Sequence, residues 1–295
     1  MELTQILKIL SALGCTQQPL SVEPFYCEED GAAYNVWRIQ FPDSIQVLKA
    51  AKGFEAEVYA NILWHPYSFA PRIVAAGIVD GEEYLLMEYV SGENLIHCTR
   101  EKLTLALDAL IQMQSQFWQN TSCDQLGFTF EDSLSGRENR IKYLNDEELE
   151  GIYQEFLQEY ISVPRTLCHD DLLPFNVITQ KDRAVFIDWE YGGILPYPVS
   201  LARLIAHGEE GEDAFFFTTE EGKAFALEYY YQNFISPKGI SREVYDRTMA
   251  LFLFYETCEW VYLGNRFEDA DPVRFSRYLE KAKVLAKRIK TSCKD

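Results

Sequence analysis

The chain lacks the features that mark nucleic-acid, zinc and membrane proteins. Its 27 Lys and Arg are outnumbered by 46 Asp and Glu, giving a net charge of −19, whereas binders of nucleic acid or anionic membranes carry clustered basic surface. Its seven cysteines form no CxxC pair and no His/Cys group at metal-ligand spacing. No run approaches the ~18 apolar residues of a membrane span, and the first helical stretch lacks a basic lead and a cleavage site. We therefore expect a cytoplasmic protein with reduced thiols, no nucleic-acid partner and no membrane partner.

The sequence is typical of a globular protein and divides into a strand-rich first part and a helix-rich remainder. The chain has 295 residues, of which 47% are hydrophobic, enough for a large core. After a leading helix, alternating patterns predict strands at about 20–28, 33–41, 45–51, 72–79 and 83–90, with one helix at 53–64. Helical patterns then dominate, at about 102–118, 145–161, 219–234, 242–263 and 273–290. We expect an α+β fold of two lobes: residues 1–90, a small five-stranded antiparallel β lobe with one helix besides the leading helix, and residues 91–295, a larger and mainly helical lobe.

Polar residues interrupt an apolar run at 167–178, "LCHDDLLPFNVI". Buried polar groups of this kind need partners or a ligand. Asn176 precedes a short strand pattern, and Asp188 ends the next one, "RAVFID", across the turn "QKDR". A hairpin there would bring Asn176 and Asp188 together. Amide and carboxylate oxygens suit Mg²⁺, which usually completes its shell with phosphate and water, and Asp171 on the preceding loop could hold a substrate hydroxyl. This is the arrangement that phosphoryl transfer requires.

The predicted β lobe contains a lysine that could bind the phosphates of a nucleotide. Lys49 lies on the third predicted strand, where a lysine can reach the α and β phosphates, and an acidic residue on the next helix would hold it. Glu55 and Glu57 are the candidates. Glu55 is favoured because Tyr59 lies four residues on, along the same apolar stripe.

The fifth predicted strand leads into the second lobe. The backbone from Glu88 to Val90 is placed to pair with an adenine edge. An ordinary core strand accounts for the same residues equally well.

These residues resemble the small-molecule kinases of protein-kinase-like fold, the family that holds aminoglycoside phosphotransferases and choline/ethanolamine kinases. The similarity rests on "HDDLLPFN" at 169–176, "IDWEYGG" at 187–193 and the lysine of "IQVLKAA", and it covers roughly residues 15 to 210. It implies phosphorylation of a hydroxyl on a small, cationic or neutral, molecule, with ATP (GTP is the alternative) and Mg²⁺. "HDDLLPFN" with "IDWEY" resembles the choline-kinase side, and "DGAAYNVWRI" the aminoglycoside side, so both acceptor classes stay open.

The resemblance also implies roles for single residues. Asp171 would be the catalytic base, Asn176 and Asp188 the Mg²⁺ ligands, and Lys49 with Glu55 the nucleotide-binding pair. His169 would brace the loop as a structural residue.

Two departures from the family pattern keep other functions open. No G-x-G-x-x-G occurs, which argues against a protein kinase. Ser200 stands where the family usually has Asp at the start of a helix; serine can cap that helix but supplies no charge. A kinase-fold protein with weak or lost turnover, acting as a binding protein, is therefore the alternative to an active enzyme.

The acceptor site is expected on the carboxy-terminal helices. Glu256 and Glu259 lie three residues apart beside Trp260 on the predicted helix 242–263. Carboxylates with an aromatic ring could hold a polyamine or a quaternary ammonium group. An amphipathic core helix with a solvated edge explains the same pattern.

Overall fold

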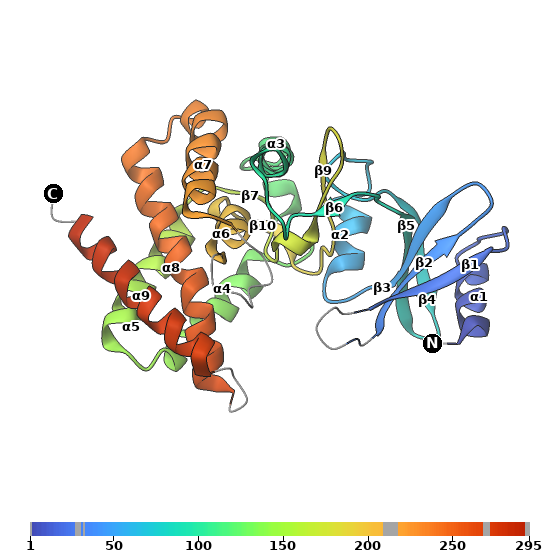
Figure 1. Ribbon diagram of the computed structural model, residues 1–295, viewed down its shortest axis with the longest axis horizontal. Helices are drawn as coiled ribbons and strands as arrows, with labels where there is room; N and C mark the ends of the chain where they lie inside the picture. The colour runs from blue at the N-terminus through green and yellow to red at the C-terminus, as the bar shows by residue number, and fades with distance from the viewer. Residues whose placement is uncertain (1, 27–30, 32, 209–217, 268–271, 293–295) are drawn as a thin grey trace.

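The computed structural model describes residues 2–26, 31, 33–208, 218–267 and 272–292. A β-rich lobe lies at one end of the molecule and a helical lobe at the other (Figure 1). The two are linked by the segment after residue 88 and by a backbone hydrogen bond from Phe54 N to Glu190 O at 3.1 Å. The α+β, two-lobed fold class is confirmed.

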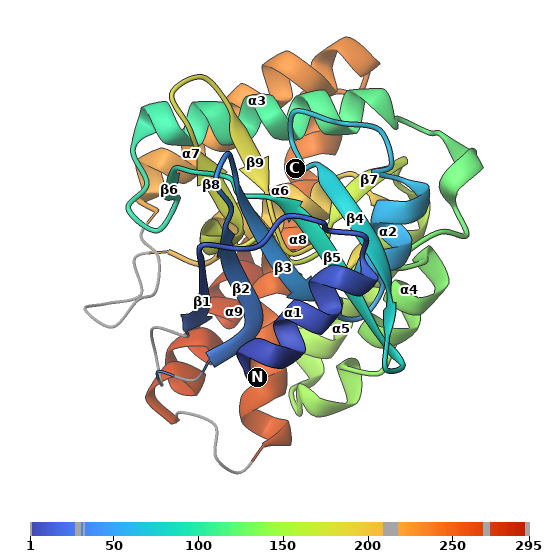
Figure 2. The ribbon, with the colours of Figure 1, turned by 90° about the vertical axis from the view of Figure 1, so that its right-hand side faces the viewer.

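The β-rich lobe is built on a five-stranded antiparallel sheet. Its strand order is β1-β2-β3-β5-β4, with β1 Ser21–Tyr26, β2 Ala33–Gln40, β3 Ile45–Ala50, β4 Ile73–Val79 and β5 Glu82–Glu88. Helix α1 (Leu3–Ala12) packs on one face, and in Figure 2 it lies in front of the sheet with the helical lobe behind. Because side chains alternate along a strand, Leu48 points into the α1 core while Lys49 points towards α2 (Glu55–Asn61) and the helical lobe.

The helical lobe is packed around one large core. Its helices are α3 Arg100–Gln116, α4 Phe130–Glu138, α5 Glu147–Ser162, α6 Pro198–Ala206, α7 Glu220–Tyr230, α8 Arg242–Arg266 and α9 Pro272–Ser292. Helix α8 is central and packs against α9, α6 and α5. Two small sheets lie on the side facing the β lobe: β7 Arg165–His169 pairs with β10 Gly192–Pro196, and β6 Glu93–Asn94 pairs with β8 Val177–Thr179, which pairs with β9 Ala184–Phe186.

Two helix boundaries differ from the sequence prediction. Helix α8 continues through Gly264 to Arg266, beyond the predicted end at residue 263. A Cβ on Gly264 would lie 2.1 Å from Cδ2 of Phe275, so this glycine lets α9 approach α8 closely instead of ending the helix. Helix α6 begins at Pro198, with Tyr197 at its N-cap. Ser200 is therefore inside the first turn and does not cap the helix.

Within the described ranges, no helix combines the length and the apolar character that crossing a bilayer would require.

Candidate active site

Lys49 lies at the junction of the two lobes. Its Nζ is 2.8 Å from Oε1 of Glu55 and also contacts Oδ1 of Asp188. Glu55 is fully buried whereas Glu57 is exposed, and of these two glutamates it is Glu55 that pairs with the lysine. Burial alone would lower the pKa of Lys49, but the two carboxylates outweigh it and raise the pKa. The lysine is therefore held as a cation.

The loop between β7 and β8 carries Asp171 and Asn176. Its backbone is tightened because Leu173 N and Asn176 Nδ2 each donate to Asp171 O at 2.8 Å. Strand β8 then pairs with β9, and Ile187 N donates to Asn176 O at 3.0 Å. The predicted hairpin is thus present, and it places Asn176 opposite the residue that precedes Asp188.

Asp188 has a left-handed backbone, with φ of 66°. This conformation is uncommon for a residue with a side chain, although Asp and Asn adopt it more readily than most. It turns the chain immediately after β9, so that the carboxylate faces the lysine of the other lobe instead of continuing along the strand. The side chain remains 41% exposed, which leaves it accessible to a ligand.

His169 connects the loop to the segment that carries Asp188. Its Nε2 donates to Ile187 O at 2.8 Å, and its ring centroid is 4.8 Å from that of Trp189. Burial lowers the pKa of His169, so the ring is neutral. Ser200 holds the backbone of the same residue, since its Oγ accepts from His169 N at 2.9 Å and donates to His169 O at 3.2 Å.

Two arginines pair with the loop between β7 and β8, a third pairs with a carboxylate of α8, and the sequence patterns predicted none of them. Arg203 on α6 contacts Asp171, Glu256 and Glu259. Arg140 donates to Glu259 at 3.0 Å, and Arg137 pairs with Asp170 at 2.6 Å. Burial alone would lower the pKa of Arg203, but the three carboxylates around it hold the pKa well above its ordinary value. One signal was available: Arg203 is the only charged residue in the apolar stretch "PVSLARLIA".

The residues predicted to bind the acceptor lie together on α8. Glu256 is 2% exposed, and Arg203 Nη1 donates to its Oε2 at 3.0 Å. Burial would raise the pKa of Glu259, but Arg203 and Arg140 lower it to about 2. Trp260 is partly buried, with its ring 5.4 Å from that of Tyr278. Both carboxylates thus already have arginine partners.

The segment predicted to pair with adenine leaves β5 at its carboxyl end. Glu88 N donates to Arg72 O at 3.0 Å, and Tyr89 N donates to Ile45 O at 3.3 Å. These bonds use two of the three N–H groups from Glu88 to Val90.

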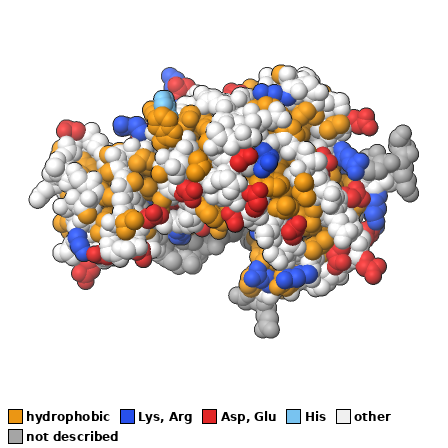
Figure 3. Space-filling model, turned by 180° about the vertical axis from the view of Figure 1, so that it is seen from behind, with side chains coloured by type: hydrophobic (Ala, Val, Ile, Leu, Met, Phe, Trp, Pro, Cys, Tyr) orange, Lys and Arg blue, Asp and Glu red, His pale blue; other side chains and the backbone are white. Residues whose placement is uncertain are grey.

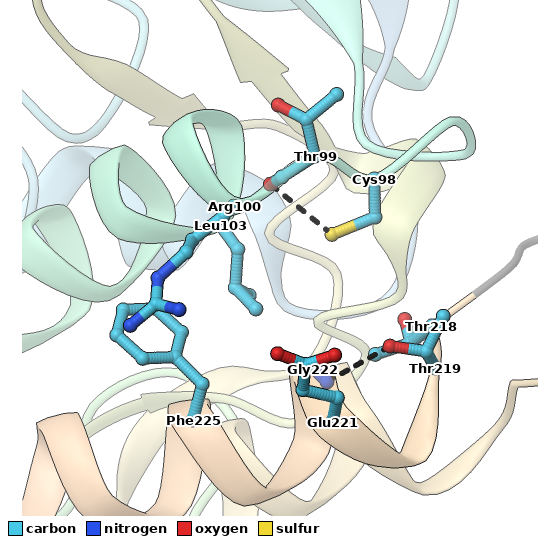
Figure 4. A pocket seen from close by; sticks show the side chains of 9 residues that line it. All are labelled: Cys98, Thr99, Arg100, Leu103, Thr218, Thr219, Glu221, Gly222 and Phe225. Atoms are coloured by element: carbon cyan, nitrogen blue, oxygen red, sulfur yellow. Dashed lines mark hydrogen bonds between the residues drawn. The ribbon is translucent and has the colours of Figure 1, made fainter.

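A separate cavity of about 200 Å³ lies between the amino-terminal ends of α3 and α7. Figure 4 shows the Arg100 guanidinium over the Phe225 ring, with Cys98, Thr218 and Glu221 nearby. The predicted site residues, all in the described part of the chain, do not line this cavity.

Acidic and basic side chains are interspersed over the face in Figure 3, across both lobes. On this face, therefore, the acidic side chains are not gathered in one patch.

Comparison with known proteins identifies the family. Solved structures with this fold include choline kinase from Cryptosporidium parvum Iowa II, at 16% identity and a TM-score of 0.63 over 97% of each chain. They also include the aminoglycoside phosphotransferase APH(3'')-Id from Streptomyces rimosus in complex with ADP and streptomycin, at 19% identity and a TM-score of 0.56 over 86% of this chain and 98% of that one. At these identities the likeness establishes the fold alone.

Two sequence matches complete the comparison. Protein LicA of Haemophilus influenzae is 37% identical over 68 residues, which are 23% of this chain and 24% of that protein. The aligned stretch therefore spans about a quarter of that curated relative. Residues 29–231, most of the chain, match the phosphotransferase enzyme family. The chain belongs to the phosphotransferase enzyme family.

Proposed function

We propose that this protein transfers the γ-phosphoryl group of ATP to a hydroxyl of a small molecule, with Mg²⁺. One observation carries the proposal: Lys49 of the β lobe meets both Glu55 and Asp188, while Asn176 is bonded to the residue before Asp188. A phosphate-binding cation and two oxygen ligands therefore converge between the lobes, as phosphoryl transfer requires. Membership of the phosphotransferase family supports the same reaction.

The donor set at the metal position fits Mg²⁺. Asn176 Nδ2 is committed to Asp171 O at 2.8 Å, which leaves the amide oxygen for a metal, and Asp188 adds a partly exposed carboxylate. Two protein oxygens suit an ion that takes its remaining ligands from phosphate and water. When bound, Mg²⁺ would neutralise charge on the phosphates.

Each remaining residue has a role that its contacts support. Asp171 would accept the proton of the acceptor hydroxyl, and Lys49 held by Glu55 would bind phosphate oxygens. The neutral, buried His169 would brace the loop through its bond to Ile187. The backbone from Glu88 to Val90 would meet the adenine.

The acceptor is proposed to be a small alcohol, with two classes to test. One is an aminoglycoside-like polyamine, and the other is a choline- or ethanolamine-like alcohol. The net charge of −19 favours a cationic acceptor because negative surface concentrates positive ligands. Glu256 and Glu259 would serve such a ligand only together with the arginines that already contact them.

The test is turnover of ATP and of GTP, with and without Mg²⁺, across aminoglycosides, choline, ethanolamine and related alcohols. We expect acceptor-dependent release of nucleoside diphosphate together with a phosphorylated product, both lost on chelation of the metal. Nucleotide binding without transfer to any acceptor would favour the binding-protein alternative.

A further inference from the structure

Arg203 is shared between the proposed base and helix α8. Its Nη2 and Nε lie 2.9 and 3.3 Å from Oδ1 of Asp171, so two N–H groups converge on one carboxylate oxygen. Its Nη1 contacts Oε2 of Glu256 at 3.0 Å and also contacts Glu259. The planar guanidinium therefore joins the catalytic loop to α8 in a fixed fork geometry.

This contact distinguishes the two oxygens of Asp171. Arg203 is bonded to Oδ1, whereas Oδ2 makes, among the described residues, a single long contact of 3.4 Å with Asn176 Nδ2. The side chain is 30% exposed, so a hydroxyl could approach Oδ2. A carboxylate without the arginine could rotate and present either oxygen in several orientations.

The arginine is itself held in place. Its side chain is 17% exposed, and Glu256, at 2% exposure, receives it from α8. Glu259 contacts Arg203 and is in turn bonded by Arg140. A guanidinium with carboxylates on both sides has little freedom to leave Asp171.

Building on the proposed function, we infer that Arg203 is a positioning residue: anchored by Glu256 and Glu259, it fixes Oδ1 of Asp171 so that Oδ2 faces the acceptor hydroxyl. In this arrangement Glu256 serves as an anchor of the arginine and not as a ligand of the acceptor. The proton passes from the acceptor hydroxyl to Oδ2 as the hydroxyl oxygen bonds to phosphorus and the bond to the nucleoside diphosphate breaks.

The experiment measures kcat and KM for Arg203→Gln, Arg203→Lys and Glu256→Gln, with the acceptor found for the wild type. The value of kcat is calculated from the concentration of protein that binds nucleotide. We expect Arg203→Gln to lower kcat by about 100-fold, the order of loss that a small misplacement of a reacting group causes, with the KM for ATP unchanged. Arg203→Lys keeps the charge without the fork and should lose less. Glu256→Gln should lower kcat while the acceptor KM stays at the wild-type value. Arg242→Lys, at an exposed ion pair on α8, is the matched control.

The outcomes separate this inference from the proposed function. Wild-type kcat in Arg203→Gln, or a raised acceptor KM with unchanged kcat in Glu256→Gln, overturns the positioning role while transfer itself stands. Full turnover in Asp171→Ala, or no transfer by the wild type, overturns the proposed function and this inference with it. If Arg203→Gln does not fold, Arg203→Lys decides: kcat equal to that of the wild type overturns the inference, and a lowered kcat at unchanged ATP KM supports it.

Discussion

Removal of Asp171 is expected to separate chemistry from nucleotide binding. Its carboxylate contacts Arg203 and Asn176 but not Lys49 or Asp188 in the structure. We expect Asp171→Ala to lower phosphoryl transfer by about 10²–10⁴-fold, the usual contribution of a general base, with ATP affinity nearly unchanged. Steady-state kinetics and calorimetry measure the two quantities. Asp182→Ala, on the exposed turn between β8 and β9, is the control and should behave as the wild type.

Asp188 combines a charge with an unusual backbone conformation. Asp188→Asn keeps a residue that tolerates positive φ but loses the negative charge, so we expect weaker binding of Mg·ATP with little loss of stability. Asp188→Ala should weaken binding as well and lose about 1 kcal/mol more stability, because alanine is strained in the left-handed region. Calorimetric titration with Mg·ATP and urea unfolding measure the two effects. Wild-type affinity in both variants would show that Asp188 does not bind the metal.

At the scale of elements, Ser200 ties helix α6 to strand β7. Its hydroxyl forms two hydrogen bonds with the backbone of His169, and both residues are buried. Ser200→Ala leaves a buried N–H without its partner, so we expect the free energy of unfolding to fall by about 1–3 kcal/mol. Urea denaturation measures it, with Ser162→Ala at the exposed end of α5 as the control. Equal stability of the two variants would mean that the bonds to His169 contribute little.

Several elements could be predicted from the sequence because their patterns are local. The five strands of the first sheet and the hairpin of β8 and β9 follow from alternation and turn signals, and the choice of Glu55 over Glu57 follows from helical spacing.

Helix α4 could not be predicted because its nine residues, "FEDSLSGRE", form almost no apolar stripe. Arg137 and Arg140 lie in and just after this helix, and their acidic partners are 33 and 119 residues away in the sequence. Contacts over such separations are set by tertiary packing, which the local pattern does not encode. The division of the lobes at residue 90 and the roles of the site residues stay predictions.

At the scale of the whole molecule, Glu259 connects α8 to α6 through Arg203 and to the turn after α4 through Arg140. Its pKa is lowered from 4.5 to about 2, so its ionised form stabilises the fold above pH 4.5, and this contribution is lost as the pH falls towards 2. The shift corresponds to a stabilisation on the order of 3 kcal/mol. We expect the difference in unfolding free energy between the wild type and Glu259→Gln to be largest near neutral pH and to shrink between pH 4.5 and 2. Urea unfolding across that range measures it, and a difference independent of pH would contradict the assignment.

Lys49 crosses from the sheet to the helical lobe to reach Asp188. Asp188 would hold Mg²⁺ through the carboxylate that Lys49 contacts here, and the Lys49 ammonium group could then hold phosphate oxygens while it keeps its bond to Glu55. The side chain would thus change from an internal counter-ion to a ligand of the nucleotide. The carboxylate of Asp188 would then have a cation beside it both before and after nucleotide binds. We therefore expect Mg²⁺ and nucleotide to bind together, and Mg²⁺ alone to bind only weakly.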